Sequence, residues 1–87
     1  MTDQQDDTSR RISSMRQRID EIDATIIGLW QERAGLSREI GAMRRSSGGP
    51  RIVLSREHEV MRRFRAGIGS EGVQLAMLVL RAGRGPL

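Results

Sequence analysis

An apolar repeat with helical spacing dominates the first half of the chain. No proline occurs between Ser9 and Ser46, and apolar residues recur there in steps of three and four: Ile12, Met15, Ile19, Ile22, Ile26, Leu29, Leu36, Ile40 and Met43. This heptad seam predicts one helix over 9–46, about 57 Å long. A compact globule of this chain length has a radius of gyration of only about 12 Å. Another chain must therefore cover part of the seam, and we expect a homodimer.

Two further helices are expected after the first. The stretch SSGGP, residues 46–50, should reverse the chain because it combines two glycines with a proline. Ser55 is a suitable N-cap for a second helix over 56–66. A third helix is expected over 71–81, where the segment LAMLVL is apolar on every side and should be buried. The loop between these two helices is marked by Gly67, Gly69 and Gly72.

The fold class predicted from these elements is all-α, with a long, a short and a medium helix in one domain over 9–87. Residues 1–8 are polar and acidic, and we expect them to form a disordered N-terminal tail. The final residues, GRGPL, are expected to form a flexible tail.

The composition excludes several classes of protein. With no cysteine and one histidine, the 87-residue chain has no disulfide framework, no metal site of the thiolate or histidine-rich kind and no cysteine nucleophile. No apolar run reaches the roughly 18 residues that span a bilayer, and no signal peptide is evident, so we expect a cytoplasmic protein. The net charge is +4, but 11 acidic residues are interleaved with 15 arginines, and aromatic residues are scarce. This pattern argues against a nucleic-acid-binding surface.

Arg33 occupies the seam position that follows Leu29. A guanidinium in an apolar seam costs on the order of several kcal/mol unless it is paired. It is therefore part of a structural ion pair, a polar residue that sets the register of the seam, or a cation that receives an anionic ligand. Arg44 returns to within about 20° of the same face, about 16 Å further along the axis, so the two arginines could grip a small dianion from both ends. Arg16 lies on another face and could join them only from a neighbouring antiparallel helix, such as that of a second chain.

Glu57 interrupts the apolar stripe of the second helix, four residues after Val53 and four before Met61. A buried carboxylate needs a partner, which is either Arg33 in a structural ion pair or a ligand in a cavity that Arg56 also approaches. The predicted core thus holds several arginines and one glutamate, with no paired nucleophile and base and no phosphate-binding glycine loop. Such a site suits a reaction in which fixed charges hold a polyanionic substrate and stabilise developing charge.

The sequence resembles the AroQ-type chorismate mutases, in particular their short intracellular subgroup in actinobacteria. The resemblance covers residues 14–85 and is carried by RQRIDEIDATIIGLWQERAGLSREIGAMR, SSGGPRIVLSRE and LAMLVLRAGRG. Its most diagnostic feature is the spacing of Arg16, Arg33, Arg44 and the Arg56-Glu57 pair.

The resemblance implies an intertwined, domain-swapped homodimer that converts chorismate to prephenate, without cofactor or metal, on the route to phenylalanine and tyrosine. Arg16 would come from the partner chain and, like Arg33, bind a substrate carboxylate. Arg44 would contact the ether oxygen and a carboxylate, and Glu57 would accept a hydrogen bond from the ring hydroxyl. Arg56 would support the site nearby. Arg44 and Glu57 are thus the expected catalytic residues.

Three weaker site candidates lie where the chain departs from its larger relatives. Those relatives have an acidic residue in place of Val53, and a serine and a glutamine on the last helix, near Gly83 and Arg84 here. In the short subgroup such a site is completed by the first enzyme of the shikimate pathway, DAHP synthase, which reshapes the mutase C-terminus. The resemblance therefore implies an activating complex through the C-terminal region, which reads RGPL here.

Two other functions remain open on the sequence. The same fold serves a lyase that releases pyruvate from isochorismate. That lyase uses much the same set of charged residues, called the cage below: Arg16, Arg33, Arg44, Arg56 and Glu57. A non-catalytic helical dimer that binds nucleic acid or protein would instead use Arg33 and Glu57 only to pair with each other. The motifs of the first helix and the SRE sequence favour the mutase.

Overall fold

The computed structural model describes residues 2–50 and 52–84, and every regular element in this part of the chain is helical. Helix α1 spans Thr2–Ser46, α2 spans Leu54–Ile68 and α3 spans Ser70–Arg84. The predicted all-helical fold of three helices, with the longest first, is confirmed, but α2 and α3 are equal in length, at 15 residues each, and are not a short and a medium helix. Among the described residues, no helix is long and apolar enough to cross a membrane.

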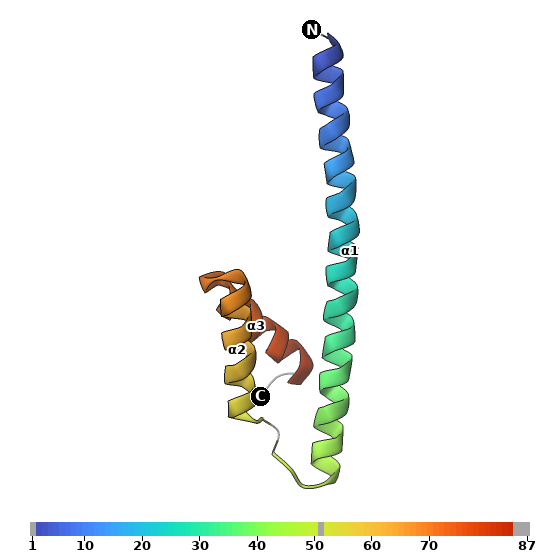
Figure 1. Cartoon of the computed structure of the whole chain (residues 1–87). Coiled ribbons are helices and arrows are strands. Elements are labelled where there is room, and N and C mark those ends of the chain that lie inside the picture. Colours follow the sequence, from blue (N-terminus) through green and yellow to red (C-terminus); the bar gives the residue numbers. More distant parts are fainter. Residues whose placement is uncertain (1, 51, 85–87) are drawn as a thin grey trace.

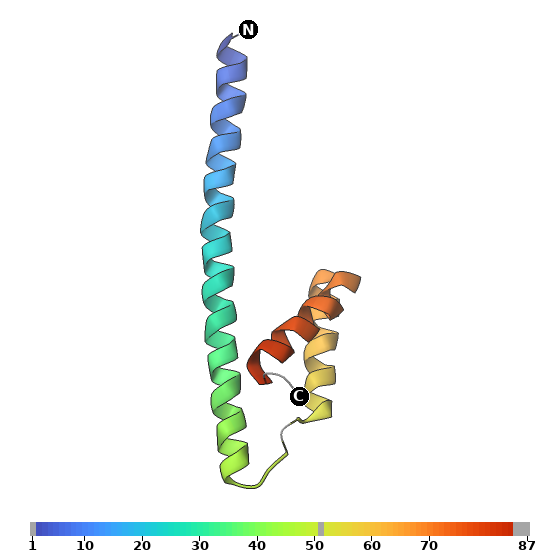
Figure 2. The same ribbon diagram turned by 180° about the vertical axis from the view of Figure 1, so that it is seen from behind.

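Helix α1 extends far beyond the other two helices. At 1.5 Å per residue its 45 residues measure about 68 Å, which matches the 69 Å long axis of the chain. The radius of gyration is 19.3 Å, well above the value of about 12 Å for a compact chain of this length. Figures 1 and 2 show α2 and α3 beside the C-terminal half of α1 only, while its N-terminal half (blue) stands alone. Residues 4–32 are accordingly exposed throughout.

The start of α1 differs from the sequence prediction. The helix begins at Thr2, whereas the sequence analysis expected a disordered tail over 1–8 and a start at Ser9. Residues 2–8 contain neither glycine nor proline, so nothing in them breaks a helix that has already formed downstream.

The end of α1 is a Schellman motif, as the SSGGP sequence indicated. Gly48 adopts a left-handed φ of 75°, which a residue without a Cβ adopts readily. The amide of Gly49 donates to the carbonyl of Arg44 at 2.7 Å, and the amide of Gly48 donates to the carbonyl of Arg45 at 3.2 Å. These bonds satisfy carbonyls at the helix end and turn the chain toward α2.

The predicted boundaries of α2 and α3 need correction. Ser55 is not the N-cap of α2: Val53 holds that position in an extended conformation, without a side-chain cap, and its carbonyl accepts from the amides of Arg56 and Glu57. The glycine loop shrinks to Gly69, whose φ is 107°. Helix α3 also runs three residues past the expected end, because packing against α1 overrides the low helix propensity of a glycine in its last turn. Residues 85–87 of the expected tail lie outside the described residues.

The core is small and centres on α3, which runs obliquely from the far end of α2 to α1 (Figures 1 and 2). The expectation that LAMLVL is buried on every side is met on one side only. Ala76 and Val79 are buried, whereas Leu75, Met77 and Leu78 remain exposed in the single chain. The other buried apolar side chains of the described residues are Ala34 and Val60.

Two helical glycines should respond oppositely to alanine. Gly67 has open space around it, so Gly67→Ala should raise the free energy of unfolding by about 0.5–1 kcal/mol through helix propensity. A Cβ on Gly72 would overlap the carbonyl of Phe64, so Gly72→Ala should lower it. Denaturant titrations at one protein concentration measure both changes, and equal signs would contradict this packing of α3 on α2.

Candidate functional site

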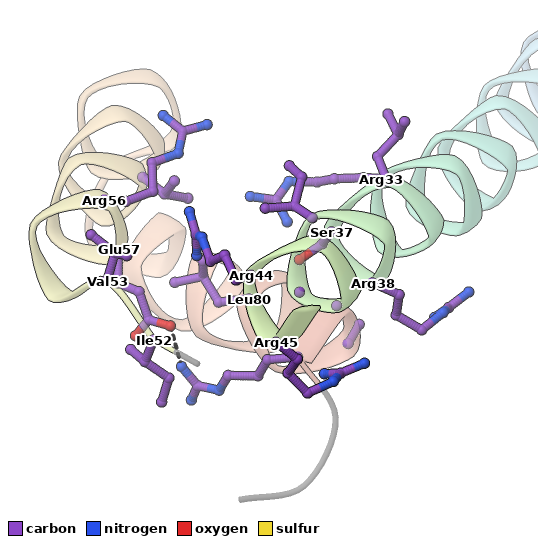
Figure 3. A pocket seen from close by; sticks show the side chains of 17 residues that line it. Arg33, Ser37, Arg38, Arg44, Arg45, Ile52, Val53, Arg56, Glu57 and Leu80 are labelled. Atoms are coloured by element: carbon purple, nitrogen blue, oxygen red, sulfur yellow. Dashed lines mark hydrogen bonds and ion pairs between the residues drawn. The ribbon is translucent and has the colours of Figure 1, made fainter. Parts of the chain in front are cut away.

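An open cavity of about 640 Å³ lies between the C-terminal half of α1, the start of α2 and the end of α3. This volume is typical of sites for small organic ligands. All four of the stronger site candidates expected from within one chain line it, and Figure 3 shows them from close by. These residues are Arg33, Arg44, Arg56 and Glu57. The weaker candidates Val53, Gly83 and Arg84 line it as well.

Arg33 enters the cavity from the seam of α1. Its side chain is half-buried, and Nη1 donates a long hydrogen bond of 3.5 Å to the carbonyl of Val79. Burial, and secondarily the positive charge of Arg56, lower the pKa of the Arg33 guanidinium. No carboxylate of the described residues forms a salt bridge with it. An anion bound beside Arg33 would counter both effects, because it stabilises the charged form.

Arg44 reaches the same space from one face of α1. It is half-buried, and in Figure 3 its guanidinium lies between Arg33 and the start of α2. Arg38 and Arg45 also border the cavity, but their guanidinium groups point away from its centre in this view. Arg33 and Arg44 therefore bring two convergent cations to one space, as their spacing predicted.

Glu57 pairs with Arg84 and not with Arg33. Nη1 of Arg84 donates to Oε2 of Glu57, and the two side chains are only 25% and 18% exposed. The structural Arg33–Glu57 pair that the sequence left open does not form among the described residues. Nε of Arg84 is buried without a hydrogen-bond partner. The sequence suggested Arg84 only weakly, since a partner 27 residues away on another helix leaves no local signal.

Arg56 lines the cavity but is turned toward its own helix. Its Nη1 donates to Oε1 of Glu59 at 3.0 Å, and the same oxygen accepts from Nη2 of Arg63 at 2.7 Å. All three side chains are about half exposed, so these ion pairs contribute little to stability. Their effect is to direct the charge of Arg56 toward the rim of the cavity.

Arg16 does not reach this cavity within one chain. It lies on the exposed half of α1, in a shallow hollow along a single helix face. Seventeen residues separate it from Arg33, which corresponds to about 26 Å along the helix axis. Only a second copy of the chain could bring an Arg16 to the cavity.

The arrangement combines an excess of cations with one carboxylate in a partly enclosed space. The described residues contain no group of three or more His, Cys, Asp or Glu side chains placed to hold a metal ion. Fixed guanidinium groups can bind a small polyanion and stabilise charge that develops on it. Ser37, which the sequence analysis missed, also lines the cavity and packs against Gly83.

Comparisons with known proteins show the family to which the chain belongs. Residues 15–79 match the family described as chorismate mutase type II. The intracellular chorismate mutase of Mycolicibacterium smegmatis is 49% identical over 93% of this chain and 78% of its own length. That of Mycobacterium tuberculosis is 46% identical over 87% and 71%, respectively.

A similar chain also occurs in a solved structure. It belongs to a non-covalent complex of DAHP synthase and chorismate mutase from Corynebacterium glutamicum with a bound transition-state analogue. The TM-score is 0.88 at 40% sequence identity, and the superposition covers 92% of this chain and 96% of that one.

Proposed function

The chain belongs to the type II chorismate mutase family, and from this premise we propose how its own residues bind and rearrange chorismate. The enzyme is an isomerase that converts chorismate to prephenate in the aromatic branch of the shikimate pathway. The observation that carries the proposal is the convergence of Arg33, Arg44 and Glu57, from two helices, on one cavity of suitable size.

We assign the two carboxylates of chorismate to the arginines. Arg33 binds one carboxylate. Its lowered pKa and its single long hydrogen bond to a carbonyl fit a guanidinium that takes its anionic partner from the substrate. Arg44 binds at the ether oxygen and to a carboxylate. Glu57 accepts a hydrogen bond from the ring hydroxyl, and Arg56 supplies positive charge at the rim. Because Arg84 holds Glu57 in the structure, the substrate hydroxyl shares this carboxylate with Arg84 or displaces it.

Catalysis follows from where charge develops in the rearrangement. The ether C–O bond breaks ahead of C–C bond formation, so negative charge accumulates on the ether oxygen in the transition state. Arg44 stabilises this charge more than the neutral ether of the ground state, which lowers the barrier. The cage also holds the substrate in its reactive, folded conformation. No group on the protein forms a covalent bond to the substrate.

We further propose that the active form is an intertwined, domain-swapped homodimer. The apolar seam from Ile12 to Met43 stays exposed in one chain, and a second copy of α1 would bury it. In an antiparallel pair that covers the whole seam, the two-fold axis passes midway between these ends, so Ile12 lies level with Met43. Arg16 lies four residues inside one end. It therefore falls level with a point on the other helix between Arg33 and Arg44.

The heptad positions put Arg16 on the correct flank of that seam. Arg16 and Arg44 are separated by 28 residues, or four heptads, so they occupy the same side of the apolar stripe. Equivalent flanks of two helices face each other across a perpendicular two-fold axis. The partner's Arg16 would thus complete the cage from the side that α2 and α3 leave open.

We also propose a complex with DAHP synthase. The corynebacterial structure supports it, because it is such a complex and its similar chain shares this fold. Arg84, the last residue of α3, forms an ion pair with Glu57. A partner protein bound to the C-terminal region could therefore change the position of Glu57 in the site. The names of the mycobacterial relatives support a location inside the cell.

Removing the charge at the ether oxygen should abolish most of the activity. Arg44→Ala should cost about 3 kcal/mol of transition-state stabilisation, by analogy with the loss of an oxyanion donor, while the dimer stays folded. Steady-state assays of chorismate consumption give kcat/KM. Arg62→Ala, an exposed arginine of α2 outside the cavity, is the matched control and should leave kcat/KM unchanged. An active Arg44→Ala enzyme would refute the assignment.

Two inactive variants should complement each other if Arg16 acts across the dimer. Mixed dimers of Arg16→Ala and Arg44→Ala chains carry both defects in one site and none in the other. After unfolding and refolding an equimolar mixture, about a quarter of the wild-type activity should return, because half of the dimers are mixed. Refolding each variant alone is the control. No recovery, together with sedimentation that shows mixed dimers, would place Arg16 outside the partner's site.

A further inference from the structure

The two halves of the cage are carried by helices whose backbones do not pack against each other. Arg33 and Arg44 stand on α1, and Glu57 stands on α2. Across the described residues, no Cα atom of α1 lies within 8 Å of one of α2, whereas α3 packs against both helices. In Figures 1 and 2 the C-terminal turns of α3 (red) lie beside the C-terminal half of α1 (green). The separation between the arginines and the glutamate is therefore set through α3.

Two consecutive residues at the end of α3 form the bridge. Gly83 is buried against α1, where a Cβ on it would overlap both the Cβ and the Oγ of Ser37. The next residue, Arg84, holds the carboxylate of Glu57 on α2. One contact thus fixes α3 to the arginine-bearing helix, and the adjacent one fixes it to the glutamate.

We propose that Gly83 and Ser37 are positioning residues for the mutase reaction, because their close contact sets the distance between the α1 arginines and Glu57. The proposal rests on the roles assigned to those residues above. In this role Gly83 does not contact the substrate. Because it has no side chain, the end of α3 can approach α1 closely. Ser37 supplies the small surface that Gly83 meets.

The contact leaves no room for a compensating rotation. Turning the hydroxyl of Ser37 would move Oγ, but its Cβ also overlaps the position of a Cβ on residue 83, and that atom is fixed by the backbone. An alanine there would force the two helices apart by on the order of 1 Å to reach a normal carbon–carbon separation. The shift would move Arg84, and with it Glu57, away from Arg33 and Arg44.

A double-mutant cycle tests this role. Gly83→Ala should lower kcat/KM about 100-fold, chiefly through kcat, as expected for a catalytic group displaced by about 1 Å. Ser37→Gly removes both overlapping atoms, so the double variant should regain kcat/KM to within roughly threefold of that of Ser37→Gly alone. Because a glycine in α1 weakens the helix, the double variant should regain activity while its Tm remains below the wild-type value. A purely structural defect would not separate activity from stability in this way.

Gly67→Ala is the matched control, since it adds a methyl group where nothing lies within 4 Å, and it should leave kcat/KM unchanged. Full activity of Gly83→Ala would overturn the proposal, as would a double variant as impaired as Gly83→Ala. If Gly83→Ala does not fold, the double variant must yield a folded, active dimer, and its failure to do so also counts against the proposal. If the two substitutions are coupled in Tm but not in kcat/KM, the contact between Gly83 and Ser37 stabilises the fold without positioning the site, and the proposal is wrong. An error in the cage assignment is detected separately, as retained activity of Arg44→Ala.

Discussion

The mismatch between the length of α1 and the size of its own domain determines the rest of the structure. The other two helices lie beside only its C-terminal half and leave the seam uncovered there too, so large apolar residues from Ile12 to Met43 remain exposed in a single chain. Exposed apolar area of this extent is a strong driving force for association, at about 25 cal/mol per Å² buried. In the proposed dimer, a second copy of α1 buries the seam and brings a further arginine to the cavity.

The site places the positive charge of Arg33 in an apolar, half-buried environment where no carboxylate of the described residues pairs with it. Arg33 interrupts the apolar seam, and burial lowers its pKa. The single carboxylate nearby, Glu57, is already paired with Arg84. The cage therefore suits a dianion, whose binding would offset the free-energy cost of removing the arginines from water. It is also divided between α1 and α2, whose backbones pack against each other only through α3, and the proposed role of Gly83 and Ser37 follows from this division.

Much of this account could be predicted from the sequence, because the deciding signals are local or periodic. The heptad seam indicated α1, the SSGGP stretch indicated the turn that ends it, and charged residues in apolar stripes indicated Arg33 and Glu57. The helix starts at Thr2 and Leu54 were missed, because fraying and capping differ by only about 1 kcal/mol between neighbouring positions. The Arg84–Glu57 pair and the Ser37–Gly83 contact were also missed. Both depend on how α3 crosses the other helices, and no spacing along the chain reports that angle.

The measurement that tests the central claim most directly follows chorismate absorbance with the purified protein, alone and with DAHP synthase, while prephenate and pyruvate are assayed in the same samples. We predict that chorismate disappears, that prephenate forms in equal amount and that no pyruvate is released, with faster turnover when DAHP synthase is present. Isochorismate is supplied in a parallel sample, and pyruvate release from it, with no prephenate formed from chorismate, would make the site that of a lyase. Intact chorismate under both conditions would contradict the account of a charged cage that stabilises the rearrangement.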